Sequence, residues 1–256
     1  MTLIYSTNFE TVTLRDSQHL EIPITHGFQF DAPGGAAIWM EGLDRTTPGV
    51  TPHSGARCLG MELTDITKSG RNEFNILQLE NSITTNQLYV SVWLFLPAGF
   101  QLHSPTFNSF ELDNPYFTGA PDYAPYVGVH IYQNPAPGPF DLDLVGRDVT
   151  NTFIHLQDVT GYALPVGVWF KLDYYVVRDK TNGTIKTWVN GVPVHSVTGI
   201  STQHPTITDW FTTPAKIYYG TDDVYSPYQL WVDDLAIYDS MPPQLTISGL
   251  VQGKYP

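Results

Sequence analysis

The sequence predicts an all-β protein, an antiparallel β-sandwich of the jelly-roll type, and three observations support this prediction. Short runs rich in β-branched and aromatic residues recur between turn-forming residues, as is typical of sandwich strands. The sequence has no long stretch with the apolar spacing of an amphipathic helix. Its 21 Gly and 20 Pro residues are spread along the chain, which suits many short strands joined by loops.

The clearest predicted strand is Trp169–Val177. Within it, Phe170 and Leu172 share one face, whereas Lys171 and Asp173 lie on the other. Side chains alternate between the two faces of a strand, so this pattern indicates one buried face and one face turned away from the core.

A hairpin follows this strand and joins the predicted strands Thr184–Val189 and Val192–Val197. The two residues between them, Asn190 and Gly191, suit a type I′ turn because both central residues of that turn need positive φ. Pro193 lacks a backbone N–H, so we expect the second strand to begin there or to lie at a sheet edge.

About a dozen strands in a chain of 256 residues predict a single domain, residues 1–256, because all-β domains often reach about 200–250 residues. The sequence contains no repeat of fixed period and no linker. The other predicted strands are Cys58–Leu63, Glu73–Leu79, Gln87–Leu96, Thr106–Leu112, Tyr126–Tyr132, Phe140–Val145, Phe153–Gln157, Lys216–Gly220 and Gln229–Tyr238.

The composition excludes several classes of protein. The 12 Lys and Arg residues against 25 Asp and Glu give a formal net charge of −13, which argues against binding to nucleic acid. No apolar run approaches the roughly 20 residues that a membrane span requires. The single cysteine, Cys58, excludes an intramolecular disulfide, and we expect it to be buried as a small hydrophobic residue.

Three stretches, taken in order along the chain, resemble the concanavalin A-like lectin/glucanase jelly rolls. The first is Asn8–Glu10, followed later by His53–Leu59. The second is Gly167–Asp173, which leads into Lys186–Val192, and the third is Leu230–Tyr238. The resemblance covers almost the whole chain and implies a jelly-roll fold, whereas it says much less about activity.

Within that superfamily, the nearest pattern is similar to the heparin-lyase-like and alginate-lyase-like polysaccharide lyases. Their inner sheet carries an Arg-x-Glu strand, which Arg71 and Glu73 match. A Lys-x-Gly-x-Tyr strand is approximated by Lys216, Tyr218 and Tyr219. The resemblance implies that these residues bind the substrate and that Tyr218 belongs to the catalytic set. The alternative for Arg71 and Glu73 is a cross-strand salt bridge.

The lyase pattern is incomplete at its second strand. Where the lyases carry Gln-x-His, this sequence reads Phe110–Asp113, and the next strand offers His130 without the glutamine. His130 and Tyr132 share a face, where they could bind a sugar or transfer a proton. Their alternative role is that of a hydrogen-bonded pair within the sheet.

Glu111 and Asp113 also resemble the first half of the Glu-x-Asp-x-x-Glu signature of laminarinase-like glucanases. The third carboxylate would fall at Tyr116, so one strand cannot supply both carboxyl groups, although Glu73 could contribute one. Retaining hydrolysis needs two carboxyl groups about 5–5.5 Å apart. In the alternative interpretation, Asp113 ends a strand and accepts hydrogen bonds from loop amides.

A calcium site is predicted from Glu10 and the pair Asp233 and Asp234. In many members of the superfamily, a glutamate near the N-terminus meets an aspartate of the last strand, and loop carbonyls complete an oxygen shell of the kind that calcium prefers. The alternative is surface acidity or a salt bridge. The pair Asp141 and Asp143 is a weaker candidate, since no calcium-loop spacing follows it.

Aromatic residues in or near the predicted loops could stack on sugar rings. Tyr116 and Tyr126 are candidates, because the C–H face of a sugar matches an aromatic surface. By contrast, we expect Trp93, Trp169 and Trp188 in the sandwich core, since they lie within strong predicted strands.

Glycan recognition without catalysis is the leading function that these patterns predict, with a polysaccharide or glycan as the partner. The alternative is a polysaccharide-cleaving enzyme, either a uronate lyase or a glycoside hydrolase that uses Glu111. A third interpretation is a structural assembly protein with an exposed apolar patch. The net charge of −13 favours a neutral or weakly charged glycan.

The expected location is extracellular or on the surface of a virion. The first residues, MTLIYSTNFETV, have neither the basic start nor the apolar stretch of a signal peptide. Jelly rolls of this superfamily usually act outside cells, so a component of a particle assembled in the cytoplasm, such as a phage, would reconcile the two observations. Homo-oligomerisation or assembly into such a particle is a further expectation.

Overall fold

A computed structural model provides the structure of the chain. It describes the backbone of residues 1–11, 13–16, 19–21, 28–31, 36–41, 49–63, 71–76, 85–100, 107–113, 126–133, 139–148, 150, 152–203, 211–218 and 228–243. Side chains are described for residues 1–11, 49–62, 85–100, 127–131, 139–148, 150, 152–203 and 229–243.

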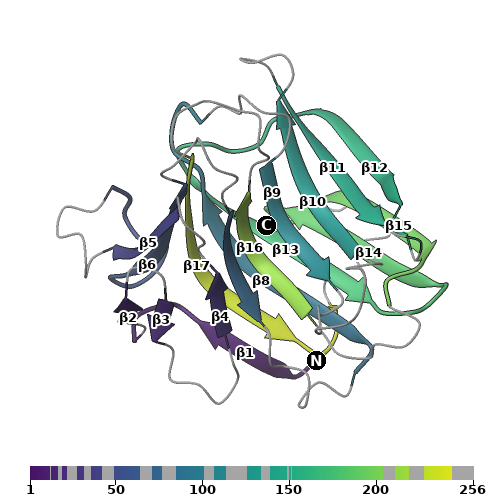
Figure 1. The fold of residues 1–256 in the computed structure, drawn as a ribbon, viewed down its shortest axis with the longest axis horizontal. Coiled ribbons are helices and arrows are strands. Elements are labelled where there is room, and N and C mark those ends of the chain that lie inside the picture. Colours follow the sequence, from purple (N-terminus) through teal and green to yellow (C-terminus); the bar gives the residue numbers. More distant parts are fainter. Residues whose placement is uncertain are drawn as a thin grey trace.

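The described strands form two large antiparallel sheets, which Figure 1 shows as layers that pack on each other. The eight-stranded sheet has the order β15-β14-β13-β8-β17-β6-β5, with β1 paired to β17 as its eighth strand. Its strands are β1 (Leu3–Thr7), β5 (Ala36–Glu41), β6 (Cys58–Leu63), β8 (Gln87–Phe95), β13 (Trp169–Val177), β14 (Gly183–Val189), β15 (Val192–Ile200) and β17 (Tyr228–Tyr238).

The seven-stranded sheet has the order β12-β11-β10-β9-β16-β7-β4. A separate pair, β2 (Thr13–Asp16) and β3 (His19–Glu21), completes the described strands. The strands of the seven-stranded sheet are β4 (Phe28–Asp31), β7 (Arg71–Ile76), β9 (Phe107–Asp113), β10 (Tyr126–Gln133), β11 (Phe140–Arg147), β12 (Phe153–Tyr162) and β16 (Phe211–Tyr218).

The observed architecture confirms the predicted all-β sandwich. The strands Cys58–Leu63 and Trp169–Val177 have the predicted bounds. The hairpin turn is confirmed as well, because Asn190 and Gly191 have φ values of 51° and 75°. The strand that follows lies at the edge of its sheet, where a proline such as Pro193 is tolerated.

The predicted start of β16 at Lys216 is wrong, because the strand begins at Phe211. Pro214 suggests a turn in the sequence, but the register with β7 shifts between Thr212 and Ala215. A β-bulge of this kind accommodates a residue that cannot donate to the ladder. Local sequence alone therefore misplaces the start of the strand.

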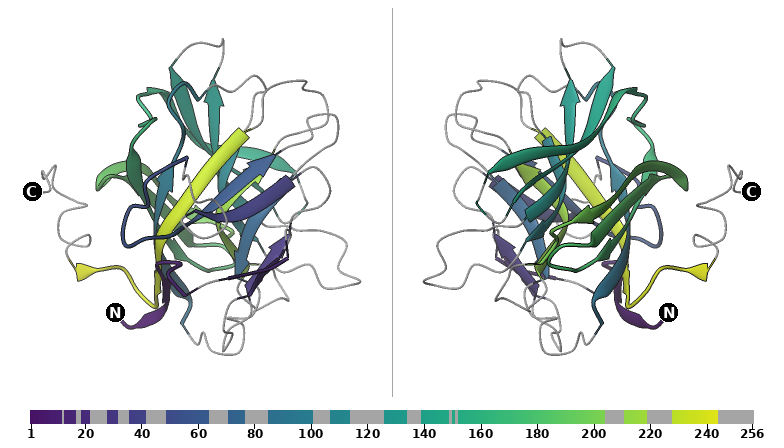
Figure 2. Two further views of the ribbon diagram at one scale, coloured as in Figure 1. Left: turned by 90° about the vertical axis from the view of Figure 1, so that its left-hand side faces the viewer. Right: turned by 90° about the vertical axis from the view of Figure 1, so that its right-hand side faces the viewer.

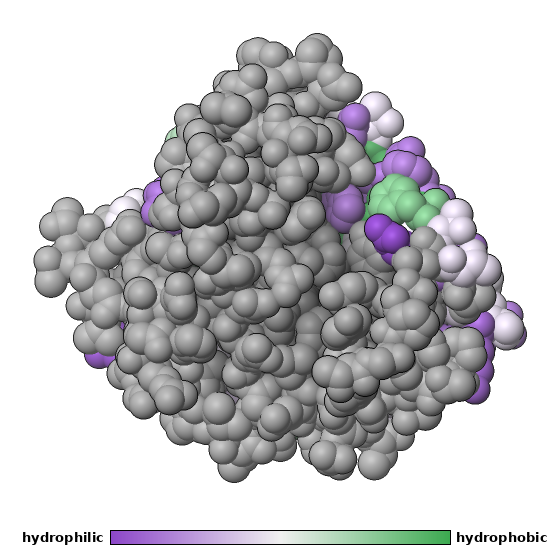
Figure 3. All heavy atoms as spheres, in the orientation of Figure 1, coloured by the Kyte–Doolittle hydropathy of each residue, from purple (hydrophilic) through white to green (hydrophobic). Residues whose placement is uncertain are grey.

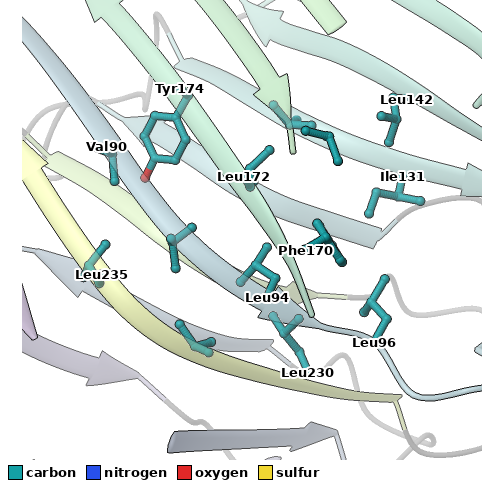
Figure 4. Packing of buried hydrophobic residues seen from close by; sticks show 14 of the residues in the cluster. Val90, Leu94, Leu96, Ile131, Leu142, Phe170, Leu172, Tyr174, Leu230 and Leu235 are labelled. Atoms are coloured by element: carbon teal, nitrogen blue, oxygen red, sulfur yellow. The ribbon is translucent and has the colours of Figure 1, made fainter. Parts of the chain in front are cut away.

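The main core lies between the two sheets. Alternate residues of β8 and β13, such as Val90, Leu94 and Phe170, are at most 2% exposed and meet Ile131 and Leu142 of the other sheet. Figure 4 shows these side chains within the core, with Leu94 and Phe170 between Val90 on one side and Ile131 and Leu142 on the other. Each fully buried side chain of this size contributes roughly 1.5–3 kcal/mol to stability, so this layer holds the sandwich together.

A buried histidine adds a polar link between the sheets. His195 of β15 is 2% exposed, and its Nε2 donates to the carbonyl oxygen of Leu142 on β11 at 3.3 Å. Its Nδ1 accepts the hydroxyl of Thr187 at 2.7 Å in this tautomer. Burial lowers the pKa of the ring, which keeps it neutral and able to make both bonds.

The placement of the three tryptophans corrects an expectation from the sequence. Trp93, Trp169 and Trp188 do not belong to the main core; they lie on the outer face of the eight-stranded sheet. Strand alternation explains the result, because Val92 and Leu94 occupy the inward positions on either side of Trp93. Trp188 is nevertheless 3% exposed, in a small cluster with Tyr89.

The first and last described strands lie side by side, as Figures 1 and 2 show near the N-terminus. β1 pairs with β17 from Leu3 opposite Tyr238 to Thr7 opposite Leu235. This pairing brings Glu10 into the same part of the sheet as the acidic residues of β17. Within the described residues, no helix is long and apolar enough to cross a membrane.

Candidate functional site

All predicted catalytic and ligand-binding residues whose backbone is described lie on one sheet, the seven-stranded one. Their strands are neighbours in the order β10-β9-β16-β7. The sandwich therefore gathers residues that are far apart in the sequence. These residues are Arg71 and Glu73 on β7, Glu111 and Asp113 on β9, Tyr126, His130 and Tyr132 on β10, and Lys216 and Tyr218 on β16.

The backbone register refines this picture. Glu73 lies opposite Lys216 and Arg71 lies opposite Tyr218 across β7 and β16. Glu111 lies opposite Gly128 of β10, two residues from His130.

Among the predicted site residues of this sheet, only His130 has a described side chain. Two further predicted ligands, Tyr116 and Tyr219, lie outside the described residues. The roles assigned to all of these residues stay predictions.

His130 lies on the outer face of the seven-stranded sheet. Val129 and Ile131 on either side belong to the main core, so alternation directs His130 away from it. Its residual exposure of 8% leaves a small accessible surface. In the register it lies between Asn108 of β9 and Asp143 of β11.

Asp143 continues this row toward the edge strand. It is 3% exposed, and Asp158 of β12 lies opposite it. Its Oδ2 accepts the Nδ1–H of His155 at 2.6 Å, while its Oδ1 is buried without a hydrogen-bond partner. Burial, followed by the neighbouring carboxyl group of Asp158 with its negative charge, raises the pKa of the Asp143 carboxyl to about 7.

Asp143, His155 and Asp158 also form a set of potential metal ligands. Their ligand atoms lie within 4.8 Å of one another, and this is the one such group of three or more within the described part of the chain. The sequence indicates Asp143 only as one member of the acidic pair Asp141 and Asp143. It gives no signal for His155 or Asp158, because their approach depends on the register between two strands.

The raised pKa leads to a prediction about Asp143→Asn. The native protein holds a proton on Asp143 up to about pH 7, whereas the unfolded chain loses it near pH 4, so stability falls as the pH rises between these values. The amide cannot ionise. We therefore expect the variant to have a higher melting temperature than the wild type at pH 8 and to lose this advantage toward pH 4. Each 1 kcal/mol gained in the free energy of unfolding should raise the melting temperature by about 2–4 °C. Thermal melting across this range is the measurement.

Asp158→Asn is the matched control for this prediction, because it removes the neighbouring charge and leaves Asp143 in place. We expect it to raise the melting temperature at pH 8 by a smaller amount. A wild-type advantage over Asp143→Asn that grows from pH 4 to pH 8 would contradict the assignment.

The predicted calcium ligands meet the same loop, residues 51–57, from two sides. Glu10 Oε1 accepts the backbone N–H groups of Ala56 and Arg57 at 2.7 and 2.9 Å. Gly55, which precedes Ala56, has a φ of 60°, and a Cβ at this position would clash with Glu10 Oε1. The glycine therefore permits both the backbone conformation and the close approach of Glu10.

Asp233 and Asp234 hold the other end of this loop. Asp233 Oδ2 accepts the N–H of Ser54 at 3.1 Å, and its Oδ1 accepts the N–H of Asp234 at 2.8 Å. Asp234 accepts the Nδ1–H of His53 at 2.6 Å and the hydroxyl of Ser54 at 2.7 Å. In this arrangement N–H and O–H donors occupy the carboxylate oxygens.

These contacts do not match an oxygen shell for calcium. Calcium takes six to eight oxygen ligands, whereas N–H and O–H donors already bind both carboxylate oxygens of Asp233 and Asp234 and one carboxylate oxygen of Glu10. The three residues also do not appear as a cluster of ligand atoms within 4.8 Å, in the part of the chain that the structure describes. Calcium binding there stays a prediction that this geometry does not favour.

Comparisons with known proteins define the class of fold. No protein-family model matches the sequence, and no curated protein matches it. The structure is similar to an endo-β-1,4-glucuronan lyase from the fungus Trichoderma reesei, with a TM-score of 0.60 and 12% identity over 92% of this chain and 95% of that chain. The fold is therefore a concanavalin A-like sandwich, and the likeness concerns the fold alone.

A second solved structure with this fold is the receptor binding domain of botulinum neurotoxin D. Its TM-score is 0.51 and its identity 11%, over 98% of this chain and 52% of that chain. The chain thus spans about half the length of that toxin domain. Both likenesses concern the fold, and together they confirm the jelly roll that the sequence motifs predict.

Proposed function

We propose that the protein binds a neutral or weakly charged polysaccharide along the outer face of the seven-stranded sheet. The row His130, Asp143 and Asp158 carries this proposal. It places polar groups side by side on three neighbouring strands, which also flank the strands of the other predicted site residues. Strands lie about 4.8 Å apart, so such a row can meet successive hydroxyl groups along a sugar chain.

The charge of this row favours a neutral ligand. Asp143 lies opposite His130 and Asp158 lies opposite Asp143, and the whole chain carries a formal net charge of −13. A uronate carboxylate at this end of the sheet would face the negative charge of Asp158, and also that of Asp143 once it loses its proton above about pH 7. Hydroxyl groups of a neutral sugar, in contrast, can donate to these oxygens.

The fold of the similar proteins also supports a glycan-related role. One of them is named as a lyase of glucuronan, a polysaccharide, and that likeness covers nearly the full length of both chains.

An assembly role has less support. Among the exposed large apolar residues with described side chains, Leu3, Phe153 and Val192 are on separate strands, whereas Val166 and Val168 lie between β12 and β13. In Figure 3, hydrophilic and hydrophobic residues are mixed along the coloured edge of the molecule. A place on a virion stays a prediction.

A glycan-array screen with the full chain tests the proposal. We expect binding to neutral polysaccharides, and we expect His130→Ala to weaken it at least about tenfold, or 1.4 kcal/mol. His130→Gln, which keeps hydrogen-bonding groups, should weaken it less. Lys186→Ala is the control, because Lys186 lies on β14 of the other sheet. Binding that is absent from the array, or that is unchanged in His130→Ala, would overturn the proposal.

A uronate lyase is the second candidate, and the likeness to the glucuronan lyase favours it. In such a reaction a base removes the C5 proton of the uronate, the C4–O bond breaks, and the leaving oxygen takes up a proton. His130 is the described residue that could serve as that base, within the limit set by its 8% exposure. The unsaturated product absorbs in the ultraviolet, so glucuronan incubated with the protein distinguishes the two functions directly.

A further inference from the structure

We propose that the outer face of the eight-stranded sheet carries a second binding site, which takes a single uncharged pyranose residue. A hollow of about 400 Å³ opens there, within the roughly 300–1,000 Å³ of small-molecule sites. This site is independent of the function proposed above, since it lies on the other sheet. Its lining residues are Tyr89, Trp93, Lys171, Asp173, Asn190 and Pro242.

Two neighbouring strands form the floor of this hollow. Lys171 of β13 lies directly opposite Trp93 of β8 in the register. Asp173 lies two residues further along β13 on the same face, and it accepts the hydroxyl of Tyr89 at 2.8 Å. An aromatic surface and a hydrogen-bonding edge thus stand side by side, which is the combination that a sugar ring requires.

The aromatic floor is held in place before any ligand arrives. The ring of His53 stacks on Trp93 with centroids 3.7 Å apart and an interplanar angle of 19°. Asp234 in turn fixes His53 through the Nδ1 hydrogen bond of 2.6 Å. A pre-positioned ring loses little conformational freedom on binding, so more of the stacking energy remains as affinity.

The hairpin turn of Asn190 forms one wall of the hollow. The side-chain Oδ1 of Asn190 accepts the N–H of Lys171 at 2.8 Å, and the N–H of Asn190 donates to the Lys171 carbonyl at 2.9 Å. These bonds leave the Nδ2 amide group of Asn190 available to donate to a ligand hydroxyl. The adjoining Gly191 has no side chain that could narrow the hollow.

The buried carboxylate supplies the acceptor. Asp173 is 2% exposed, and its contacts with Tyr89 and with Lys171 Nζ, at 2.8 and 3.1 Å, both involve Oδ1. Oδ2 is therefore the oxygen that can accept a hydrogen bond from a ligand. A buried carboxylate oxygen without a hydrogen-bond donor lowers the stability of the fold, unless a ligand or a water molecule donates a hydrogen bond to it.

The charges select an uncharged ligand. Lys171 and Asp173 form an ion pair, so the hollow carries no net charge from these groups. A ligand cation above Trp93 would meet the ammonium of Lys171, and a ligand anion would meet the carboxylate of Asp173. A neutral sugar avoids both penalties, because it offers a C–H face to the ring and hydroxyl groups to both charged side chains.

Nuclear magnetic resonance of the full chain tests this site. The probes are methyl glucoside, methyl galactoside, methyl mannoside and the disaccharide cellobiose, with glucuronate and tetramethylammonium as charged probes. We expect at least one neutral probe to shift the amide signals of Asn190 and Gly191 and the indole signal of Trp93, with a Kd of about 1 mM. Cellobiose should bind about as tightly as methyl glucoside if the hollow takes a single glucose residue, and tighter binding would show a contact with a second residue outside the hollow.

Variants decide whether the observed binding uses this hollow. Trp93→Ala should weaken it at least about tenfold, and Asp173→Asn should weaken it less. Trp93→Phe keeps a ring and should retain part of the affinity, which separates loss of binding from loss of folding. Phe153→Ala, an exposed aromatic residue on β12, is the control that should leave binding unchanged.

Three outcomes would overturn the site. They are the absence of any saturable shift with the neutral probes, shifts that Trp93→Ala leaves intact, and preferential binding of a charged probe. His130→Ala separates this site from the function proposed above, because it should leave the binding of these probes unchanged. A negative binding result for one site therefore does not contradict the proposal for the other site.

Discussion

Phe9→Ala is expected to lower the free energy of unfolding by about 3–5 kcal/mol. Phe9 is 0% exposed and belongs to the main core, although it follows the short first strand. Its backbone has a φ of 61°, which turns the chain so that this ring enters the core and Glu10 reaches the 51–57 loop. Removal of the ring leaves a cavity and releases this segment.

Urea denaturation measures this effect through the midpoint and slope of unfolding. Phe9→Leu should cost much less, because it refills most of the volume. Phe153→Ala is the control, since this side chain is 43% exposed and its loss should cost little. If the free energy of unfolding of Phe9→Ala lies within about 1 kcal/mol of the wild-type value, the Phe9 ring does not contribute to core packing as proposed.

Asp233→Ala is expected to cost about 2–3 kcal/mol, because it leaves the partly buried N–H groups of Ser54 and Asp234 without their acceptor. Asp233 is 0% exposed, and it lies beside Trp93 in the register. Its loss should also loosen the 51–57 loop. Binding of neutral glycosides to the hollow near Trp93 should therefore weaken together with stability.

The pH dependence of the stability of Asp233→Asn separates the effect of the hydrogen bonds of Asp233 from the effect of its negative charge. Burial raises the pKa of the Asp233 carboxyl to about 6, so the folded state keeps its proton longer than the unfolded chain does. Wild-type stability should therefore fall between about pH 4 and pH 6, a loss that the asparagine variant escapes. A cost of Asp233→Asn that increases across this range would contradict this account.

Melting with calcium and with a chelator tests the predicted metal site in the same proteins. A calcium-dependent rise in the wild-type melting temperature that Asp233→Ala loses would support calcium. An unchanged wild-type melting temperature would contradict the calcium prediction and leave these carboxylates with their role in holding the loop.

The strands were predictable because their signals are local. The alternation from Trp169 to Val177 sets both the strand and its faces, and Asn190 with Gly191 sets the turn. Where the local signal is misleading, as at Pro214, the sheet overrides it with a bulge. Short strands such as β1 and β4 carry too few residues for a pattern, so their existence depends on the partners that they meet.

The candidate sites depend on contacts between distant segments, which no local pattern reports. The approach of Asp143 to Asp158 follows from the register of β11 and β12. The stacking of His53 on Trp93 joins a loop to a strand, and the strong strand signal around Trp93 led to its wrong placement in the core. Long-range pairing is set by the sum of many contacts over the sheet.

The sequence by itself determined the all-β class, most strands and an acidic, weakly charged chain. It also indicated that residues near Glu111, His130 and Lys216 belong to one sheet, since the motifs that it resembles lie there. Only the tertiary structure decided that Glu10, Asp233 and Asp234 hold a loop, and that a hollow forms beside Trp93. The reason is physical: strand formation follows local alternation, whereas a site needs distances between side chains, which the packing of the whole sandwich sets.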